Sequence, residues 1–387
     1  MLRLRKFLVK IGPWLILGGL LALVGQLVFS RYKWGCRHTL PLKVLIVDYT
    51  VPFDSYKEHS GLIWLLNNLK VSAPEEREAW SAATDYLGYH PTDRAHPQRL
   101  SDLRSLEADL VYVADTYGVY RDDLRGLPQQ RSHMDWNPLV FGGLSLADAR
   151  ALGRFAERRG TLVVEFNSFC DPTETGPRRL VEGLLGVRWS GWVGRVFPNP
   201  HDGNDVPLWL AREVRRQFGV ALPREPMLVF AHRSGQLVYV TARTVDALAP
   251  QLELTAAGRR RFESARGGVP YFYWFSVVEA PLAQVDAELV LPAWLEERPE
   301  LRLHHLPMRL PLLTERRVGA SLRVYVAADL VDLDFDPGEF SNAQRIEAQA
   351  AALFTRNRVS SAPLFWRFFR PAMETLIDEL AEIRRAR

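Results

Sequence analysis

The sequence predicts an α/β fold: a mostly parallel sheet with helices on both faces, preceded by one transmembrane helix. Three observations predict it. An uncharged apolar run lies near the N-terminus, three later apolar runs end on or beside an acid, and a helix-start signal follows each of those later runs. Parallel strands buried on both faces are apolar throughout, and alternation of strand with helix is typical of such sheets.

The composition is that of a globular chain with a sizeable core. Apolar residues make up 47% and charged residues 24% of the 387 residues, and the formal net charge is +4. Disorder requires low hydrophobicity and high net charge, so it is excluded. A nucleic-acid-binding domain carries a concentrated basic stripe, and none is present, so we expect no nucleic-acid partner.

The predicted transmembrane helix covers residues 11–30. From Ile11 to Phe29 no side chain carries a formal charge. A stretch of about 20 such residues spans a hydrocarbon core of about 30 Å. Basic residues stand on both sides of the run, so local charge alone does not set its orientation.

A basic N-terminus followed at once by an apolar run resembles an uncleaved signal-anchor, and no small-residue cleavage site follows it. We therefore expect a single-pass protein of the inner or plasma membrane, with the bulk of the chain extracytoplasmic. A short basic tail at 1–10 and a juxtamembrane linker at 31–42 would flank the helix. A cleaved signal peptide is the alternative.

Three strand-helix units make up the predicted α/β core, residues 43–200. The predicted strands are Leu42–Asp48, Ala108–Asp115 and Thr161–Phe166. The predicted helix starts are Ser55 with Glu58, Ser145 with Asp148, and Asp171 ahead of Pro172. Units of this kind stack their helices on the faces of one sheet.

The second half of the chain is richer in strand signals. Residues 201–345 are predicted to form a β-rich extension with a late core strand, and residues 346–387 a C-terminal helical segment. The strand predictions are a hairpin over Met227–Thr241, an aromatic strand over Val269–Ala280 and the late core strand over Leu322–Leu330.

Acids stand at the ends of four predicted strands: Asp48, Asp115, Glu165 and Asp329. In an open parallel sheet, ligands bind outside the carboxyl ends of the strands. Acids gathered there repel one another unless they pair, cap a helix, bind a cation or hydrogen-bond a hydroxyl-rich ligand such as a sugar. We therefore expect a ligand crevice at this edge. For each acid the alternative is a helix cap or an arginine partner.

The candidate site residues lie at or near these strand ends. The catalytic candidates are Asp115, Glu165 and Cys170. The ligand-binding candidates are Asp48, Ser60, Tyr117, Asn167 and Asp329. Phosphate-loop, H-E-x-x-H and paired C-x-x-C motifs are absent, so the sequence predicts neither a metal site nor a cofactor.

The order of three segments, LKVLIVDYT, ADLVYVADTYG and GTLVVEFNSFCDPT, resembles the class I glutamine amidotransferase-like superfamily. The resemblance covers roughly residues 43–200 and implies a flavodoxin-like sheet with a nucleophile on a strand-to-helix elbow. Members of that family carry G-x-C-x-G at the elbow and a late His-x-Glu pair. Cys170 has no flanking glycines and the sequence has no His-x-Glu pair, so the resemblance implies a domain without the catalytic triad.

These observations predict a membrane-anchored, extracytoplasmic binding or accessory protein that serves cell-envelope or exopolysaccharide assembly. Its partners would be the lipid bilayer, through residues 11–30, and an envelope glycan or the polysaccharide-synthesis machinery. Two alternatives stay open: a carboxylate-dependent, glycan-directed hydrolase, and a structural subunit of a membrane complex.

Overall fold

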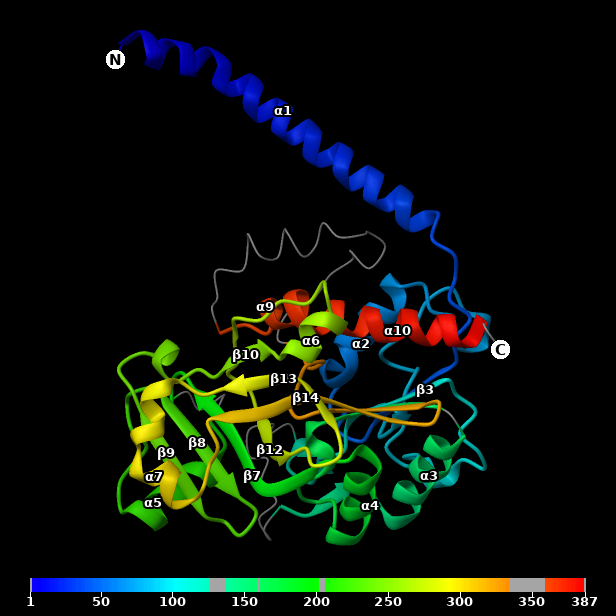
Figure 1. Ribbon diagram of the computed structural model, residues 1–387, viewed down its shortest axis with the longest axis vertical. Coiled ribbons are helices and arrows are strands. Elements are labelled where there is room, and N and C mark those ends of the chain that lie inside the picture. The colour runs from blue at the N-terminus through cyan, green and yellow to red at the C-terminus, as the bar shows by residue number, and fades with distance from the viewer. Residues whose placement is uncertain (1, 126–136, 159, 202–205, 334–358, 386–387) are drawn as a thin grey trace.

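A nine-stranded sheet runs through the centre of the molecule (Figure 1). The computed structural model describes residues 2–125, 137–158, 160–201, 206–333 and 359–385. The strands of this sheet are β1 (Val44–Asp48), β2 (Leu87–Gly88), β3 (Leu110–Asp115), β6 (Thr161–Glu165), β10 (Gln251–Leu254), β11 (Val269–Pro270), β13 (Gln284–Val290), β14 (Arg309–Val318) and β15 (Ser321–Val326). They are ordered β11-β10-β13-β14-β15-β6-β3-β1-β2.

The sheet is mixed. From β2 through β1, β3 and β6 to β15 each strand is parallel to its neighbour. From β15 through β14, β13 and β10 to β11 each strand is antiparallel. The predicted mostly parallel, flavodoxin-like sheet is therefore wrong for half of the strands. The parallel order ends at β14 and β15, which only Gly319 and Ala320 join, and strands joined so closely pair antiparallel.

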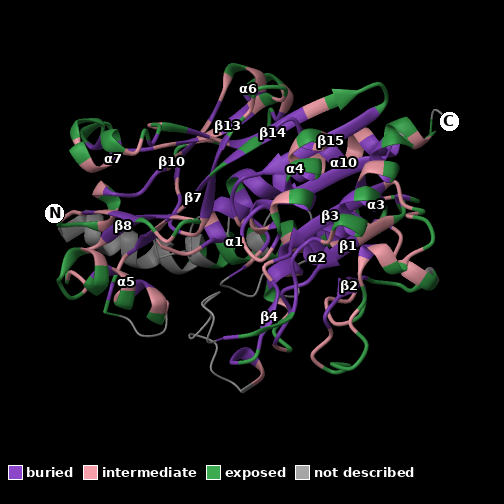
Figure 2. Ribbon diagram, turned by 90° about the horizontal axis from the view of Figure 1, so that it is seen from below, coloured by how far each residue is buried: buried purple, intermediate pink, exposed green. Residues whose placement is uncertain are grey.

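Helices cover both faces of the parallel half (Figure 1). On one face lie α2 (Lys57–Asn68) and α10 (Arg370–Arg385), and on the other α3 (Leu146–Glu157) and α4 (Thr175–Leu185). Successive strand residues therefore join different cores. Ile46 clusters with Leu62 of α2, whereas Val47 clusters with Leu152 of α3. Every residue of β3 is buried, as Figure 2 shows, which confirms the prediction of strands buried on both faces.

Apart from α1 (Leu2–Gly35), the remaining helices are short. They are α5 (Leu208–Phe218), α6 (Ala256–Arg261), α7 (Pro299–Leu303), α9 (Ala362–Leu364) and a π-helical turn over Phe365–Phe369 that leads into α10. Single 3₁₀ turns cover Pro74–Glu76, Leu100–Asp102, Asp123–Arg125, Phe166–Ser168, Val245–Ala247 and Ala293–Glu297. A two-stranded ribbon is formed by β4 (Val119–Tyr120) and β5 (Leu139–Phe141).

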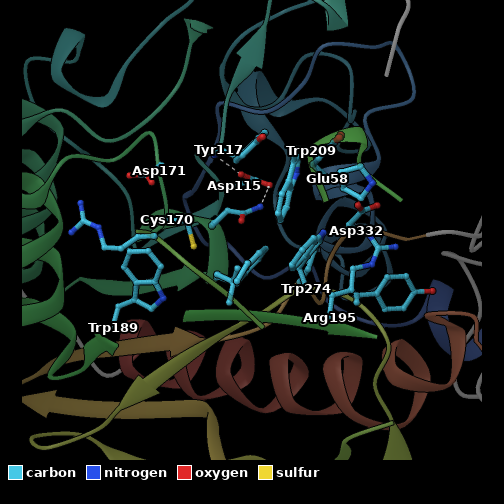
Figure 3. A pocket seen from close by; sticks show the side chains of 18 of the residues that line it. Glu58, Asp115, Tyr117, Cys170, Asp171, Trp189, Arg195, Trp209, Trp274 and Asp332 are labelled. Carbon is cyan, nitrogen blue, oxygen red and sulfur yellow. Dashed lines mark hydrogen bonds between the residues drawn. The ribbon is translucent and has the colours of Figure 1, made fainter. Parts of the chain in front are cut away.

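A second, four-stranded antiparallel sheet lies beside the first. Its strands are β7 (Arg188–Phe197), β8 (Met227–His232), β9 (Leu237–Thr241) and β12 (Phe275–Glu279), ordered β12-β7-β8-β9. The β8–β9 hairpin confirms the hairpin predicted over Met227–Thr241. The two sheets are joined where the Ser276 N–H donates to the Ala327 carbonyl oxygen at 2.7 Å. A pocket opens between them (Figure 3).

The strand predicted over Val269–Ala280 is in fact two strands in different sheets. β11 pairs with β10 in the large sheet, and β12 pairs with β7 in the small one. The four residues between them, from Tyr271 to Trp274, carry the chain from one sheet to the other. The uniformly apolar and aromatic pattern concealed this break because both strands are largely buried.

One helix, α1 (Leu2–Gly35), takes in the apolar N-terminal run. The helix also includes the basic residues Lys10, Arg31 and Lys33, so it neither begins nor ends where the apolar run does. In the part of the chain that the structure describes, no helix is both long enough and apolar enough to cross a bilayer. This finding contradicts the predicted transmembrane helix at 11–30, the signal-anchor and the single-pass membrane localisation.

Two of the three predicted helix starts are wrong. α2 begins at Lys57, after Tyr56 in the left-handed region at φ 48°, and Ser55 is not its cap. α4 begins at Thr175, because the 3₁₀ turn after β6 and a loop through Asp171 come first. The Ser145–Asp148 capping box of α3 is confirmed, with each side chain accepting from the other's backbone N–H.

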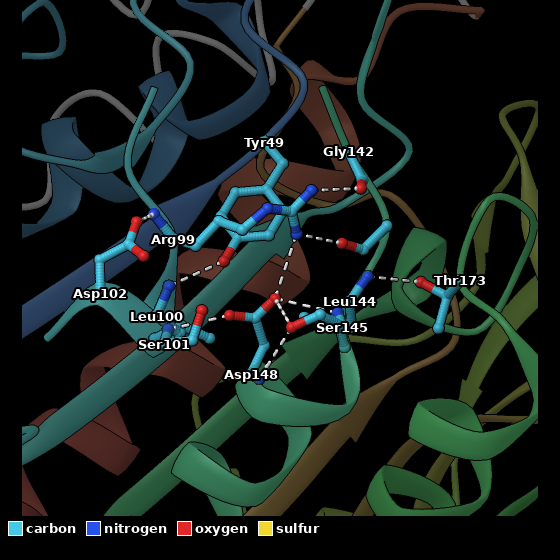
Figure 4. A network of polar contacts seen from close by, with 11 residues as sticks. Tyr49, Arg99, Leu100, Ser101, Asp102, Gly142, Leu144, Ser145, Asp148 and Thr173 are labelled. Carbon is cyan, nitrogen blue, oxygen red and sulfur yellow. Dashed lines mark hydrogen bonds and ion pairs between the residues drawn. The ribbon is translucent and has the colours of Figure 1, made fainter. Parts of the chain in front are cut away.

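The Asp148 carboxylate also holds the loops before α3 (Figure 4). It is fully buried and accepts from the Ser145 hydroxyl at 2.8 Å, the Ser101 N–H at 2.9 Å and the Arg99 guanidinium at 3.1 Å. Arg99 donates in addition to the carbonyl oxygen of Gly142 at 2.8 Å. One carboxylate therefore fastens segments that lie more than 40 residues apart in the chain.

Asp148→Ala should lower the free energy of unfolding by about 3 kcal/mol, because it removes the Asp148 half of the capping box and leaves the Arg99 charge without its buried partner. Urea unfolding followed by circular dichroism measures this. Arg150→Ala on the exposed side of the same helix is the control and should stay within about 0.5 kcal/mol of the wild type. Equal effects of the two substitutions would contradict the role assigned to Asp148.

Candidate functional site

The pocket between the two sheets has a volume of about 550 Å³. Its floor is the carboxyl end of the parallel strands, and its opposite wall is the four-stranded sheet (Figure 3). The carboxylates that line it are Glu58, Asp115, Asp171, Asp329 and Asp332. The basic side chains are Lys57, Arg195 and Arg233. The aromatic side chains that line it and bear on the argument are Tyr117, Trp189, Trp209 and Trp274.

Strand register brings three of the predicted acids together. Asp48 at the end of β1 is the partner of Asp115 at the end of β3. β3 pairs in turn with β6, which ends at Glu165, and the Glu165 partner on β15 is Val326, three residues before Asp329. The carboxyl ends of parallel strands meet at one edge. The structure thus places the predicted acids along one edge of the sheet. Their hydrogen-bond partners differ from one acid to the next.

Asp115 forms the pocket floor and is held by three donors. Its Oδ1 accepts from the Thr50 hydroxyl at 2.7 Å and the Tyr117 N–H at 2.6 Å, and its Oδ2 accepts from the Asn167 amide at 2.7 Å. Burial and the nearby Asp48 carboxylate raise the pKa of Asp115 to about 6, and the three hydrogen bonds oppose this rise. With two donors on Oδ1, the proton of the neutral acid belongs on Oδ2.

The Asn167 side chain suits a partner that changes its protonation state. An amide presents a donor and an acceptor. In the orientation observed, its Nδ2 donates to the ionised Asp115 carboxylate. A half-turn of the same amide would present its oxygen to the proton of the neutral acid. Asn167 can therefore accompany Asp115 through both states.

Asp48 lies behind the floor and does not line the pocket. It is fully buried, accepts from the Thr50 N–H at 2.8 Å and shares a hydrogen bond with His59 Nδ1 at 2.7 Å. Direct ligand binding by Asp48 is therefore excluded by its burial. Ser60 does not line the pocket either. Its hydroxyl donates to the Lys57 carbonyl oxygen in the first turn of α2.

Glu165 and Asp329 form a second pair of acids with strongly raised pKa values. Glu165 is buried behind the pocket, where the Tyr112 hydroxyl donates to its Oε1 at 2.5 Å. Burial and then Asp329 raise its pKa well above the usual value. Asp329 lines the pocket, and burial together with Asp332 raises its pKa in the same direction. Asp332 itself pairs with Lys57 at 2.9 Å.

Cys170 lines the pocket but is not poised as a nucleophile. Burial raises the pKa of its thiol to about 12, so the reactive thiolate is scarce at neutral pH. Its sulfur lies 3.9 Å from the Ser276 hydroxyl, which is not a base that could activate it. The side chain behaves as a small buried apolar residue, and cysteine-dependent amide chemistry is not supported.

The wall opposite the floor was not foreseen from the sequence. Trp189, Gly191, Val193 and Arg195 all line the pocket, as expected for alternate residues on one face of β7. Gly191 has φ +94°, and a side-chain carbon there would lie 2.4 Å from the His232 ring. The placement of the four lining residues at every second position of β7 was the sequence signal that could have identified this wall.

Two tryptophans form an extended aromatic surface in the pocket. The rings of Trp209 and Trp274 are inclined by only 24°, with centroids 6.4 Å apart. The Arg195 guanidinium lies over the Trp274 ring at 5.7 Å and over Phe197 at 4.8 Å. Figure 3 shows Asp115 and both tryptophans around the same space. The pocket thus combines ring faces with carboxylates.

Metal binding has no evident ligand set here. Across the described ranges, no three His, Cys, Asp or Glu side chains gather closely enough to hold a metal ion.

No protein-family model and no curated protein matches the sequence. Three solved structures show limited similarity. A β-galactosidase from Rahnella sp. R3 is 11% identical over 75% of this chain and 29% of its own, with a TM-score of 0.33. An exo-β-1,4-mannosidase from Opitutaceae bacterium strain TAV5 is 12% identical over 76% and 32%, with a TM-score of 0.29.

The third is Agd3, described as a novel carbohydrate deacetylase, which is 9% identical over 85% of this chain and 33% of its own, with a TM-score of 0.35. This chain spans about a third of the length of these proteins. Their descriptions name carbohydrate-acting enzymes. Their TM-scores are too low to establish a shared fold.

Asp115 should titrate with a midpoint near pH 6 when followed by carbon NMR of the labelled carboxyl group. Its folded-state pKa lies above the unfolded value near 4, so the unfolded chain ionises first as pH rises. Stability is therefore lost between about pH 4 and 6, by roughly 3 kcal/mol for this group. The pH dependence of unfolding should be flatter by this amount in Asp115→Asn. A midpoint near pH 4 would contradict the geometry described.

Iodoacetamide at pH 8 should modify Cys36, which is exposed, and leave Cys170 intact in the folded protein. The two thiols serve as controls for each other, because both should react once the chain is unfolded in urea. Peptide mass spectrometry distinguishes them. Native-state alkylation of Cys170 at the rate of Cys36 would contradict its assignment as an inert buried residue.

Proposed function

We propose that this chain is a glycan-directed hydrolase whose pocket binds a carbohydrate and whose Asp115 acts as the general acid. The observation that carries the proposal is the Asp115 carboxyl group itself. It lies on the pocket floor with a pKa raised to about 6, beside tryptophan faces. A catalytic acid works best when its pKa lies near the operating pH, and Asp115 meets that condition in mildly acidic to neutral solution.

The lining of the pocket supports a sugar as the ligand. A sugar presents hydroxyl groups at its edge and C–H groups on its faces. Trp209 and Trp274 offer the apolar surface that such a face requires, and Asp329 and Glu58 offer acceptors for hydroxyl hydrogens. Pockets that combine aromatic walls with a few polar groups fix both the position and the orientation of a ligand.

The chemistry follows from two carboxyl groups with different roles. Asp115 would pass the proton on Oδ2 to the glycosidic oxygen as its bond to the anomeric carbon breaks. A second carboxylate of the same pocket, Asp332 or Glu58, would take a proton from the attacking water or attack the carbon itself. The distance between the two carboxyl groups decides between these mechanisms. Inverting enzymes, which activate a water, hold the two groups about 6.5–9.5 Å apart, and retaining enzymes, in which the carboxylate attacks the carbon, hold them about 5–5.5 Å apart.

A binding or accessory role without hydrolysis is the second candidate. It is favoured by the three donors on Asp115, since Thr50, Tyr117 and Asn167 together occupy both of its oxygens. A carboxylate held in this way could be structural. An envelope glycan held without cleavage would then be the ligand.

Asp115→Asn should lower kcat for glycan hydrolysis by about 100-fold or more while changing the Kd of the same oligosaccharide only a few-fold, because a general acid contributes 10²–10⁴ to the rate. An array of oligosaccharides, scored for released reducing ends and by calorimetry, measures both quantities. Hydrolysis that survives the substitution would exclude Asp115 as the acid. Tight binding without hydrolysis by the wild type would favour the accessory role.

Trp274→Ala should weaken glycan binding about tenfold or more, since a large aromatic contact in a desolvated pocket dominates binding energy. The matched control is Trp294→Ala, because Trp294 is 40% exposed and does not line the pocket. Equal affinities for the two variants would argue against the pocket as the glycan site.

A further inference from the structure

A continuous chain of hydrogen bonds runs from a buried histidine to the pocket floor. His59 Nδ1 lies 2.7 Å from Asp48 Oδ2. The Thr50 N–H donates to Asp48 Oδ1 at 2.8 Å, and the Thr50 hydroxyl donates to Asp115 Oδ1 at 2.7 Å. His59 and Asp48 are both fully buried, so the chain is shielded from solvent up to Asp115.

The proton positions along this chain follow from its partners. His59 Nε2 lies 2.8 Å from the Ala82 carbonyl oxygen, which can only accept, so Nε2 carries a hydrogen. At the other end, the Gly118 N–H donates to the Thr50 hydroxyl oxygen at 2.7 Å. The Thr50 hydroxyl hydrogen is thereby directed to Asp115.

We propose that the buried Asp48, held by His59, and Thr50 are positioning residues that together set the charge state of Asp115 at the pocket floor. The inference rests on the proposed function, in which Asp115 must hold a proton to transfer. None of the three touches the ligand in this account. Asp48 places a negative charge beside the reacting carboxyl group, and Thr50 presents an oriented hydroxyl group to it.

Two opposing effects reach Asp115 from this element. After burial, the Asp48 charge on the neighbouring strand is the largest contribution that raises the pKa of Asp115, and the Thr50 hydrogen bond is one that lowers it. The other titratable and charged groups in the pocket or around Asp115 are Lys57, Glu58, Tyr117, Tyr120, Glu165, Cys170, Asp171, Arg195, His232, Arg233, Tyr273, Asp329 and Asp332. None of them is hydrogen-bonded to Thr50 among the contacts of the described residues.

Asp48→Asn and Thr50→Val should therefore shift the Asp115 midpoint in opposite directions. Asp48→Asn keeps the size of the side chain and removes its charge. The midpoint of the Asp115 titration, and with it the corresponding limb of the pH profile of kcat/KM, should therefore move down by about one pH unit. Thr50→Val removes the hydroxyl donor, so the limb should move up. Thr50→Ser keeps the hydroxyl and should leave the limb at its wild-type position.

The test combines the pH profile of kcat/KM with carbon NMR titration of Asp115 in the full-length variants. A merely structural role would lower kcat or stability without moving the midpoint. An unmoved midpoint in Asp48→Asn overturns the proposal. If that variant does not fold, an unmoved Asp115 midpoint in Thr50→Val overturns the proposal instead.

The titration also separates this proposal from the proposed function. If the wild type hydrolyses no glycan but the NMR midpoints shift as stated, the proposed function fails while the control of Asp115 by Asp48 stands. If glycans are hydrolysed and the midpoints do not move, the proposed control of Asp115 fails while the proposed hydrolase function stands.

Discussion

Three neighbouring parallel strands each end on a carboxylic acid, and the crowding of these acids is the constraint on which the rest of the structure depends. Like charges this close and this buried cannot all ionise without compensation. The chain compensates each one differently. Asp48 is hydrogen-bonded to His59, Asp115 accepts from three donors, and Glu165 accepts from the Tyr112 hydroxyl and keeps a raised pKa. Only Asp115 of these three also lines the pocket, which is why it carries the proposed chemistry.

The small sheet turns this rim of acids into a pocket. It contributes the face of β7 with Trp189 and Arg195, and the loop ahead of β12 contributes Trp274. The backbone hydrogen bond from Ser276 to Ala327 and the bridge between Phe275 and Ala328 hold β12 beside the chain that leaves β15. The aromatic wall and the acidic floor therefore come from distant parts of the sequence and meet only in the folded chain.

Much of the floor could be predicted, because buried parallel strands have a plain apolar pattern and their ends share an edge. Asp115, Asn167, Tyr117 and Asp329 were found in this way and do line the pocket. The wall could not be predicted, since β7 reads as RWSGWVGRVF, with glycines and charges that obscure a strand. The antiparallel half of the sheet was missed because β10, β13 and β14 were not among the predicted strands. The capping pair of Ser145 and Asp148, which was predicted separately for the helix after the second strand, is also confirmed.

The most direct test of the account is a crystal structure of the chain in complex with an oligosaccharide that it binds. The account predicts a sugar ring stacked on Trp274, with a glycosidic or hydroxyl oxygen within hydrogen-bond distance of Asp115 Oδ2. A glycan bound elsewhere on the molecule, with the rim of acids empty, would contradict it.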